Sequence, residues 1–376
     1  METSKKSILF IPAWWPCSFF NEQQEVYAER YDIYQFHGKC IQLSRKTSLK
    51  HPFQESVSIQ SINEKMLEGS IYWHKKRTNE ALESRFHQIA DKVGKGIIEQ
   101  MHGQKPDFIY LQSVSELATF VADWATRNGI KIVLSEHILY VRHGIDFLTH
   151  KKEWVYSIAD SVFCVSNYLY RNLLTSGFQM RNVRVIGNMI NSHAVPDEWN
   201  KLTKNGKIIF VASHTSDKDI TTLIDVAQRL ESSRIAIDVY GLTGEEVLTN
   251  GKSIAEQISE RNIGDTISCK GVVSHQKLLE KYAEYSLLLS TSISETFGLA
   301  VAEAIAHGTP VVCTDSGGIH DFINERNGII VPIRDTNKIV EAIHCSYNRT
   351  YDYTEMSKEI LSKFGEPTYK ANTTLE

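Results

Sequence analysis

Short apolar runs alternate with helix-length amphipathic segments along almost the whole chain. Ten such runs have the length and composition of strands: SILFIP, DFIYL, IKIVLS, SVFCVS and VRVIG, then KIIFVA, IAIDVY, YSLLLS, TPVVC and GIIVP. Segments of helical periodicity lie between them, for example TNEALESRFHQIADKVGKGIIEQM, DITTLIDVAQRL and KIVEAIHC. Because strands that are apolar throughout need cover on both faces, this alternation predicts parallel sheets with helices on both sides.

A polar stretch, NSHAVPDEWNKLTKNGK, separates the two series of strands. We therefore predict an α/β chain of two Rossmann-like, doubly wound domains that face each other across a cleft, residues 1–195 and 200–350. Residues from about 350 to 376 are expected to pack back on the first domain. Ligands of such sheets bind beyond the carboxyl ends of the strands, so the cleft is the expected site. The segment 38–75 has no clear period and is predicted to be an irregular insertion.

The composition fits a folded protein with no membrane span. Hydrophobic residues make up 42% and charged residues 23%, which argues against disorder. No run reaches the roughly 18–20 apolar residues of a spanning helix. The N-terminal apolar stretch is broken by Pro12, so we interpret it as a strand rather than a signal peptide. The six cysteines form no C-x-x-C pair, which indicates a reducing compartment and a cytoplasmic location.

Charge is divided unevenly along the chain. Residues 1–190 hold 23 Lys and Arg against 19 Asp and Glu, whereas the remainder holds 18 against 26. A basic N-terminal half could contact an anionic membrane, such as the inner face of the plasma membrane, or a phosphorylated acceptor. Ordinary variation of surface charge explains the difference equally well. No nucleic-acid partner is expected.

The segment STSISETFGLAVAEAIAHGTPVVCTDSGG, residues 290–318, is the most informative part of the sequence. Its predicted helix, LAVAEAIAHG, is apolar or small on nearly every side, as in a buried helix. Glu303 is the only carboxylate of that helix. A charged side chain in such a position must be paired, bind a metal or face a ligand cavity.

Glu295 precedes Glu303 by eight positions and lies in the loop before the helix. The backbone N–H groups of Phe297, Gly298 and Leu299 are donors at the positive end of the helix dipole, an arrangement that suits a phosphate. Gly298 allows a ligand to approach the backbone closely. The alternative for each carboxylate taken alone is structural, a buried salt bridge for Glu303 and a helix cap for Glu295.

Together these residues resemble the Glu-x7-Glu motif of the retaining glycosyltransferases of family 4, which have the GT-B fold. The similarity continues in FVASHTSDKDI (210–220), VSNYLYRNLLTSGFQMRNVRVIGNMI (165–190), SEHILYVR (135–142) and FIPAWWPCSFFNEQQ (10–24). The resemblance implies an acceptor-binding N-terminal domain and a C-terminal domain that binds a nucleotide-sugar donor, such as a UDP- or GDP-sugar. No other cofactor is expected. No metal is expected either, since the sequence has no D-x-D at a strand end.

The resemblance also implies roles for individual residues. Glu303 would accept hydrogen bonds from both ribose hydroxyls, and Glu295 would stabilise positive charge that develops on the donor sugar. Lys218 would neutralise the departing diphosphate. The family usually has an arginine where this chain has Ser213, which brings no charge. We therefore expect His214, Lys270 or Arg142 to replace it, or leaving-group stabilisation to be weaker.

Four further positions follow from the same resemblance. His137, just after the strand IKIVLS, would contact the donor sugar or phosphate, and a structural histidine is the alternative. Asn188 corresponds to an asparagine that reaches across the two domains. Base contacts are expected mainly from the backbone near Lys270 and Val272.

Four aromatic side chains crowd the loop after the first strand, Trp14, Trp15, Phe19 and Phe20. They would stack on an acceptor sugar or touch lipid, and core packing is the alternative.

The resulting function is transfer of a hexose-type sugar to a saccharide or lipid-linked acceptor, in assembly of a surface polysaccharide or glycolipid. A sugar-nucleotide-binding protein without catalysis is the second hypothesis, since Ser213 replaces an arginine. Another GT-B enzyme is the third, either a sugar-nucleotide epimerase or a phosphorylase. The Glu-x7-Glu spacing disfavours the epimerase, and the lack of a pyridoxal-lysine motif disfavours the phosphorylase.

Overall fold

The computed structural model describes residues 5–12, 18–28, 30–37, 42–45, 56–58, 79–141, 147–199 and 203–375. The chain forms two compact units, Met1–Ile186 and Gly187–Glu376.

The first unit contains an eight-stranded sheet and five helices within the described residues. The strands are β1 (Lys6–Pro12), β2 (Tyr31–His37), β3 (Gln42–Arg45), β4 (Ser56–Ser58), β5 (Phe108–Gln112), β6 (Lys131–Glu136), β7 (Ser161–Cys164) and β8 (Val183–Val185). The helices are α1 (Ser18–Ala28), α3 (Asn79–Gln100), α4 (Glu116–Arg127), α5 (Phe147–Ile158) and α6 (Asn167–Thr175).

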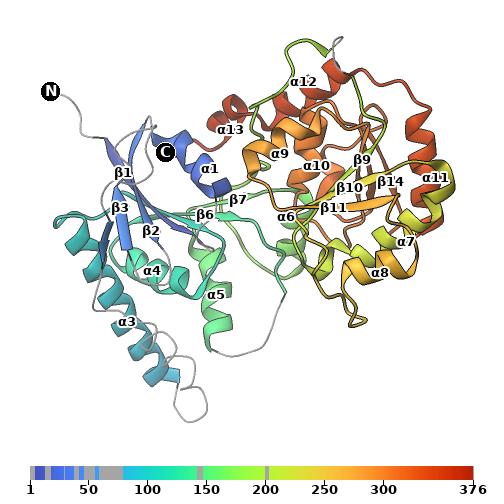
Figure 1. Cartoon of the computed structure of the whole chain (residues 1–376). Helices are drawn as coiled ribbons and strands as arrows, with labels where there is room; N and C mark the ends of the chain where they lie inside the picture. Colours follow the sequence, from blue (N-terminus) through green and yellow to red (C-terminus); the bar gives the residue numbers. More distant parts are fainter. Residues whose placement is uncertain are drawn as a thin grey trace. The chain divides into compact units, whose positions relative to one another are not determined.

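The strand order of this sheet is β4-β3-β2-β1-β5-β6-β7-β8. The neighbouring strands β2, β1, β5, β6, β7 and β8 all pair in parallel. At the edge next to β2, the strands β3 and β4 pair antiparallel. Figure 1 shows α3, α4 and α5 on one face of the sheet and α1 on the other. The five residues of β5 are all buried, as the uninterrupted apolar run DFIYL predicts.

The second unit contains a six-stranded sheet. Its strands are β9 (Ile208–Val211), β10 (Ile237–Tyr240), β11 (Ile267–Gly271), β12 (Leu287–Ser290), β13 (Val311–Thr314) and β14 (Gly328–Val331). Its α-helices are α7 (Ile220–Leu230), α8 (Ile254–Glu260), α9 (His275–Tyr282), α10 (Leu299–Ala306), α11 (Thr336–Tyr347), α12 (Tyr353–Phe364) and α13 (Glu366–Asn372). Short 3-10 helices are η2 (Ser216–Lys218), η3 (Glu231–Ser233) and η4 (Gly318–Asp321).

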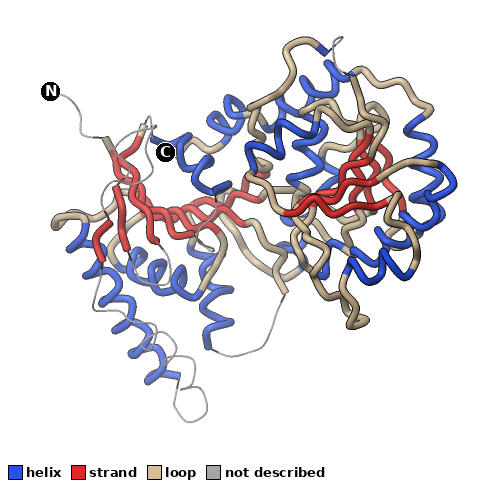
Figure 2. The backbone as a smooth tube through the Cα atoms, viewed as in Figure 1, coloured by secondary structure: helices blue, strands red, loops and turns tan. Residues whose placement is uncertain are grey.

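This sheet is parallel throughout, in the order β11-β10-β9-β12-β13-β14. Consecutive strands are wound outward from β9 in one direction and from β12 in the other, which is the Rossmann order with its topological switch point between these two strands. In Figure 2 helices cover both faces of the sheet. The prediction of two doubly wound α/β domains is confirmed for each unit.

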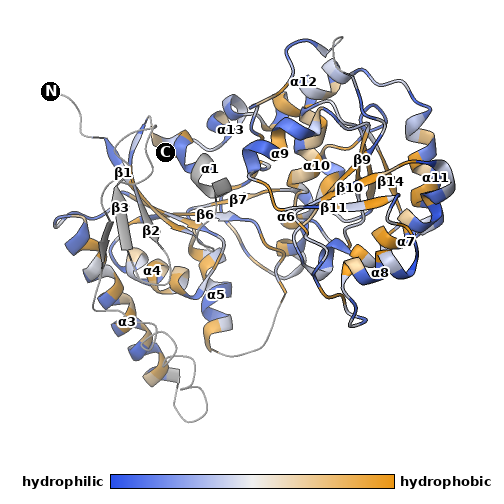
Figure 3. Ribbon diagram, in the orientation of Figure 1, coloured by the Kyte–Doolittle hydropathy of each residue, from blue (hydrophilic) through white to orange (hydrophobic). Residues whose placement is uncertain are grey.

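The core of the second unit lies between the sheet and the helices. Figure 3 shows hydrophobic colour concentrated on the strands and on α10, with hydrophilic colour on the outer surfaces of α7 and α8. Six of the eight residues of α10 are buried, so the prediction of a buried helix is confirmed. Ile208 and Leu287, on the two central strands, are fully buried members of one apolar cluster.

The structure differs from the sequence prediction in three places. β2 and the edge strand β11 were not predicted. Within the segment 38–75, which we expected to be irregular, β3 and β4 form a short antiparallel ladder; the prediction was wrong for these residues, because pairing with a sheet edge requires no apolar pattern. The rest of that segment lies outside the described residues.

The segment expected to link the domains is anchored to the second unit. The N–H of Ile190 donates to Phe364 O at the end of α12, 2.8 Å away. Both α12 and α13 belong to this unit. None of the helices in the described ranges is long and apolar enough to cross a membrane.

His307 ties the end of α10 to the incoming chain. Its ring is fully buried, with Nδ1 2.7 Å from Glu303 O and Nε2 2.8 Å from His193 O. We expect His307→Leu to lower the free energy of unfolding by about 1–3 kcal/mol, because leucine cannot replace the hydrogen bond that the buried ring makes to a carbonyl. Chemical denaturation measures this change. His344→Leu, on the exposed side of α11, is the control and should change stability by less than about 0.5 kcal/mol; equal effects of both substitutions would contradict the prediction.

Candidate active site

A cavity of about 300 Å³ lies in the second unit, at the carboxyl ends of the two central strands β9 and β12. This is the switch point at which doubly wound sheets bind their ligands. The charged or titratable side chains that line the cavity come from four different segments, and they are Lys218, His275, Tyr282, Glu295 and Glu303. Six of the predicted donor-site residues therefore lie together in one cavity: Ser213, Lys218, Glu295, Gly298, Leu299 and Glu303.

Lys218 and Glu295 are in direct contact on the cavity wall. The ammonium Nζ of Lys218 lies 2.5 Å from Oε1 of Glu295, and the Ser292 hydroxyl donates to the same oxygen at 2.7 Å. Both side chains are largely shielded from solvent, with 24% exposed for Lys218 and 15% for Glu295. A positive and a negative charge are thus held side by side where a ligand can reach both.

The loop that carries Lys218 is fixed to the loop after β12. The Thr291 hydroxyl donates to Lys218 O at 2.9 Å and to Asp219 O at 3.1 Å, and Ile293 N donates to Asp217 O at 2.7 Å. Asp219 has a left-handed backbone, φ 45°, which turns the chain from η2 into α7. The two loops at the switch point therefore form one hydrogen-bonded layer.

The Glu295 loop is also bonded through its backbone to the glycine-rich turn after β13. Glu295 N donates to Ser316 O at 2.7 Å, and Gly318 N donates to Glu295 O at 2.8 Å. Gly317 has φ 105°, which favours glycine. We call this ladder between Glu295 and residues 316–318 the backbone clasp.

The clasp needs a glycine at position 318 because the backbone of Thr296 and Phe297 lies close to the α-carbon of Gly318. A Cβ at this position would lie 2.2 Å from Thr296 O and 2.7 Å from Phe297 N, so the backbone would have to shift. We expect Gly318→Ala to lower the free energy of unfolding by about 1–3 kcal/mol and to weaken binding of a nucleotide. Thermal denaturation and calorimetry measure both effects.

Gly264→Ala is the matched control for this prediction, because nothing lies within 4 Å of a Cβ added there. If Gly318→Ala were as stable as the control, the close approach would be unimportant.

The start of α10 presents backbone donors to the cavity. Gly298 has φ 93° and ψ 55°, and Leu299 is the first helical residue. First-turn N–H groups have no acceptor within the helix and lie at the positive end of its dipole. The Phe297 side chain points the other way, buried against the rings of Phe322 and Phe364 at centroid distances of 5.2 and 5.1 Å. Phe297, predicted as a donor-site residue, therefore does not line the cavity; its ring anchors the loop.

Glu303 is held by two side chains that the sequence did not indicate. Oε1 lies 2.6 Å from Nε2 of His275, and Oε2 accepts from the Tyr282 hydroxyl at 3.2 Å. Only 4% of the Glu303 side chain is exposed. Burial, and then the Glu303 charge, raise the pKa of Tyr282 well above its ordinary value, so the phenol is a neutral donor. The structural alternative for Glu303 holds in part, since it is paired, yet it also lines the cavity.

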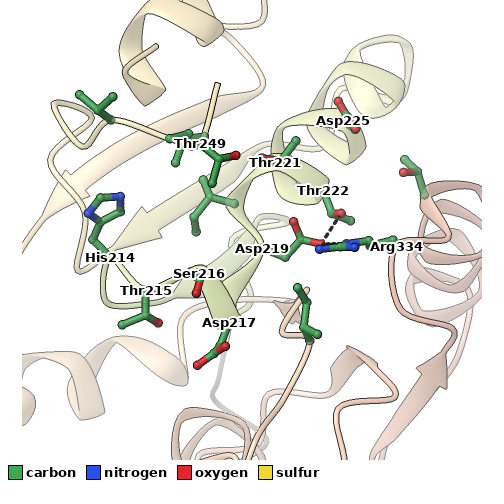
Figure 4. A pocket seen from close by; sticks show the side chains of 15 residues that line it. His214, Thr215, Ser216, Asp217, Asp219, Thr221, Thr222, Asp225, Thr249 and Arg334 are labelled. Atoms are coloured by element: carbon green, nitrogen blue, oxygen red, sulfur yellow. Dashed lines mark hydrogen bonds and ion pairs between the residues drawn. The ribbon is translucent and has the colours of Figure 1, made fainter. Parts of the chain in front are cut away.

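Ser213 and His214, which are adjacent in the sequence, line different hollows of the structure. Ser213 lines the cavity, whereas His214 lines a neighbouring hollow of about 730 Å³. In Figure 4 that hollow is bordered by η2, the start of α7 and Arg334, which lies 3.3 Å from Asp219 Oδ2. Arg142 is outside the described residues.

Lys270, Val272 and Asn188 do not line this cavity. The Lys270 ammonium lies 3.2 Å from Asp238 Oδ1, on β10. Val272 follows β11 and is 76% exposed, and Asn188 is buried near the start of the unit.

His137 belongs to the first unit and lies at the carboxyl end of β6. Its N–H contacts Glu136 Oε1 at 2.8 Å and Ser113 Oγ at 3.1 Å, and its ring Nε2 lies 3.0 Å from the Ser135 hydroxyl. Glu136 is 1% exposed and also accepts from Ile138 N and the Tyr156 hydroxyl. Burial raises the pKa of Glu136. Glu136, which was not among the predicted site residues, holds the turn that carries His137.

The four aromatic residues proposed for the acceptor cannot be placed. Trp14 and Trp15 lie outside the described residues. Phe19 and Phe20 fall in α1, but their side chains are not described. Within the described part of the chain, no group of three or more His, Cys, Asp or Glu side chains could hold a metal ion.

Two family models match adjoining segments of the chain. Residues 72–193 match "Glycosyltransferase Family 4", and residues 192–359 match "Glycosyl transferases group 1". Together with the two Rossmann-like sheets, these matches define the chain as a glycosyltransferase of the GT-B fold. The group 1 segment contains the cavity and all the residues that line it.

Individual relatives are distant. An uncharacterized 41.2 kDa protein in the cps region of Klebsiella pneumoniae is 22% identical over 300 residues, which cover 73% of this chain and 78% of the relative. The GtfA subunit of a UDP-N-acetylglucosamine–peptide N-acetylglucosaminyltransferase from Streptococcus pneumoniae is 24% identical over 273 residues, 68% of this chain. The chain spans about half the length of that relative, 52%.

Among solved structures, Anabaena Alr3699/HepE in complex with UDP and glucose superposes with a TM-score of 0.69. It is 15% identical and covers 97% of both chains. This likeness supports the fold over nearly the whole chain.

Proposed function

We propose that this glycosyltransferase is a retaining, metal-independent hexosyltransferase that takes its sugar from a nucleotide-sugar donor bound in the cavity of the second unit. The observation that carries the proposal is the grouping of Lys218, Glu295 and Glu303 with the start of α10 around one cavity at the switch point. These groups provide a cation and helix N–H donors for a diphosphate, and separate carboxylates for a ribose and a sugar.

The arrangement matches the charges that develop in glycosyl transfer. As the bond between sugar and diphosphate breaks, negative charge grows on the leaving oxygen and positive charge on the sugar ring. In our proposal Lys218 and the first N–H groups of α10 stabilise the leaving group, and Glu295 stabilises the ring. The acceptor hydroxyl attacks on the face that the diphosphate leaves, and the diphosphate takes its proton, so the anomeric configuration is retained.

The donor is proposed to be a UDP-sugar or a GDP-sugar. Solved neighbours described as complexes with UDP, among them HepE and the pneumococcal O-GlcNAc transferase GtfA, favour uridine. His137, Asn188, Lys270 and Val272 remain proposed donor contacts. They lie outside the cavity lining and are assigned only by resemblance.

The acceptor is proposed to be a saccharide or a lipid-linked saccharide, bound by the N-terminal unit with Trp14, Trp15, Phe19 and Phe20. A relative from a cps region supports assembly of a surface polysaccharide. A cytoplasmic location, with peripheral contact at the inner face of the plasma membrane, is part of the same proposal.

A donor screen tests this function. UDP- and GDP-sugars are offered first for binding and then for slow hydrolysis, and NMR identifies the anomer released. We expect one donor to be hydrolysed with retained configuration. Binding without turnover, even with an acceptor extract, would instead favour a non-catalytic sugar-nucleotide-binding protein, the alternative suggested by Ser213 on the cavity wall.

A further inference from the structure

The first and the last residue of helix α9 both contact the Glu303 carboxylate. His275 is the first residue of the helix and Tyr282 the last. They are seven positions apart, two turns, and so project from the same side of the helix. One reaches Oε1 of Glu303 and the other Oε2. The two contacts fix the plane of the carboxylate as a single contact could not.

The two contacts leave acceptor capacity on the carboxylate. Each carboxylate oxygen has two lone pairs, so a bond from α9 to each oxygen leaves one further position on each. Two acceptors held side by side match the two hydroxyls of a vicinal diol, with one hydrogen bond per oxygen. Glu303, His275 and Tyr282 all line the cavity, where such a diol can reach them.

The other charged side chains of the cavity lining, Lys218 and Glu295, pair with each other and not with Glu303. The charged or titratable side chains of the lining, within the described residues, are Lys218, Glu295, Glu303, His275 and Tyr282. Lys218 contacts Glu295, and Tyr282 is a neutral donor. His275, with 26% of its side chain exposed, is therefore the lining side chain that holds Oε1 of Glu303.

We infer that His275 is a positioning residue for the ribose of the donor, acting through Glu303. With Tyr282 it orients the carboxylate so that both oxygens accept from the 2′- and 3′-hydroxyls, and it thereby sets a preference for ribonucleotides over 2′-deoxyribonucleotides. This inference rests on the proposed function, because it takes the cavity to be the nucleotide site. Since ribose is bound equally before and during the reaction, His275 acts on KM rather than on kcat.

The test compares two ligands on matched proteins. Calorimetry measures the Kd of UDP or GDP, whichever binds better, and of its 2′-deoxy analogue. Wild type should prefer the ribonucleotide. His275→Ala should weaken ribonucleotide binding about tenfold, the loss of a charge-assisted hydrogen bond, and weaken the 2′-deoxy analogue, which keeps only its 3′-hydroxyl, clearly less. His275→Gln, whose amide can donate, should restore most of the preference.

Two further variants, Lys277→Ala and Glu303→Ala, separate the outcomes. Lys277→Ala, an exposed change on the same helix, is the control and should bind like wild type. Equal weakening of both ligands by His275→Ala would reveal a general structural role and overturn the inference, as would no weakening of either. If Glu303→Ala weakens the ribonucleotide and His275→Ala does not, only the inference fails. If wild type binds neither diphosphate, the proposed function fails with it.

Discussion

Replacement of Glu295 by glutamine is expected to lower kcat by about 10²–10³-fold, the usual effect of removing one group that stabilises transition-state charge. The carboxylate is only 15% exposed and is held by Lys218 and Ser292, so its charge lies in a fixed position rather than in bulk solvent. Glutamine keeps the shape and loses the charge. Donor affinity should remain or rise, because the variant frees Lys218 for the diphosphate.

Steady-state kinetics with the donor found by screening measure this effect. Glu284→Gln is the control. Glu284 also pairs with a lysine, Lys281 at 2.8 Å, but both are exposed, and its loss should leave kcat unchanged. A Glu295→Gln variant with wild-type kcat would remove Glu295 from the reaction and weaken the case for a transferase.

Lys218→Met is expected to lower kcat by a similar factor, about 10²–10³-fold, because no other lysine or arginine lines the described cavity to neutralise the leaving diphosphate. Ser213, which also lines the cavity, adds no charge. We also expect the free nucleoside diphosphate to bind more weakly, since the same cation contacts it before and after transfer.

Turnover and diphosphate affinity of Lys218→Met are measured together. The control is Lys281→Met, which removes an exposed lysine from the same unit. A variant that loses diphosphate affinity but keeps its turnover would show that Lys218 binds without assisting the chemical step. Unchanged affinity would mean that the helix N–H groups hold the diphosphate alone.

The architecture of each unit could be read from the sequence because its central strands are buried on both faces. Runs such as DFIYL and YSLLLS are apolar without interruption, and the structure buries them as β5 and β12. β11 was not predicted because it is an edge strand, with a half-exposed sequence that includes Lys270. The opposite edge strand, β14, was predicted from its apolar run GIIVP, so the polar residues of β11 and not its edge position alone concealed it.

The site residues that lie within one sequence segment could be predicted, whereas those that reach the site from another segment could not. Glu295, Gly298 and Glu303 lie within one contiguous segment, where spacing and helix burial are visible in sequence. His275 and Tyr282 reach Glu303 from positions 28 and 21 residues earlier. The segment VSHQKLLEKY predicts an amphipathic helix and nothing about what its ends touch. Contacts between segments depend on the packing of α9 against α10, which no local pattern encodes.

The backbone clasp determines which residues near Glu295 can change without moving the loop that carries it. The backbone of Glu295 is fixed by peptide groups, through Ser316 O and Gly318 N, and its carboxylate is held by Lys218 and Ser292. Side chains near the turn, such as Asp315 and His320, which pair with each other at 2.7 Å on the surface, can therefore be exchanged without moving the carboxylate. Variation at these two surface positions should therefore leave the reaction centre unchanged.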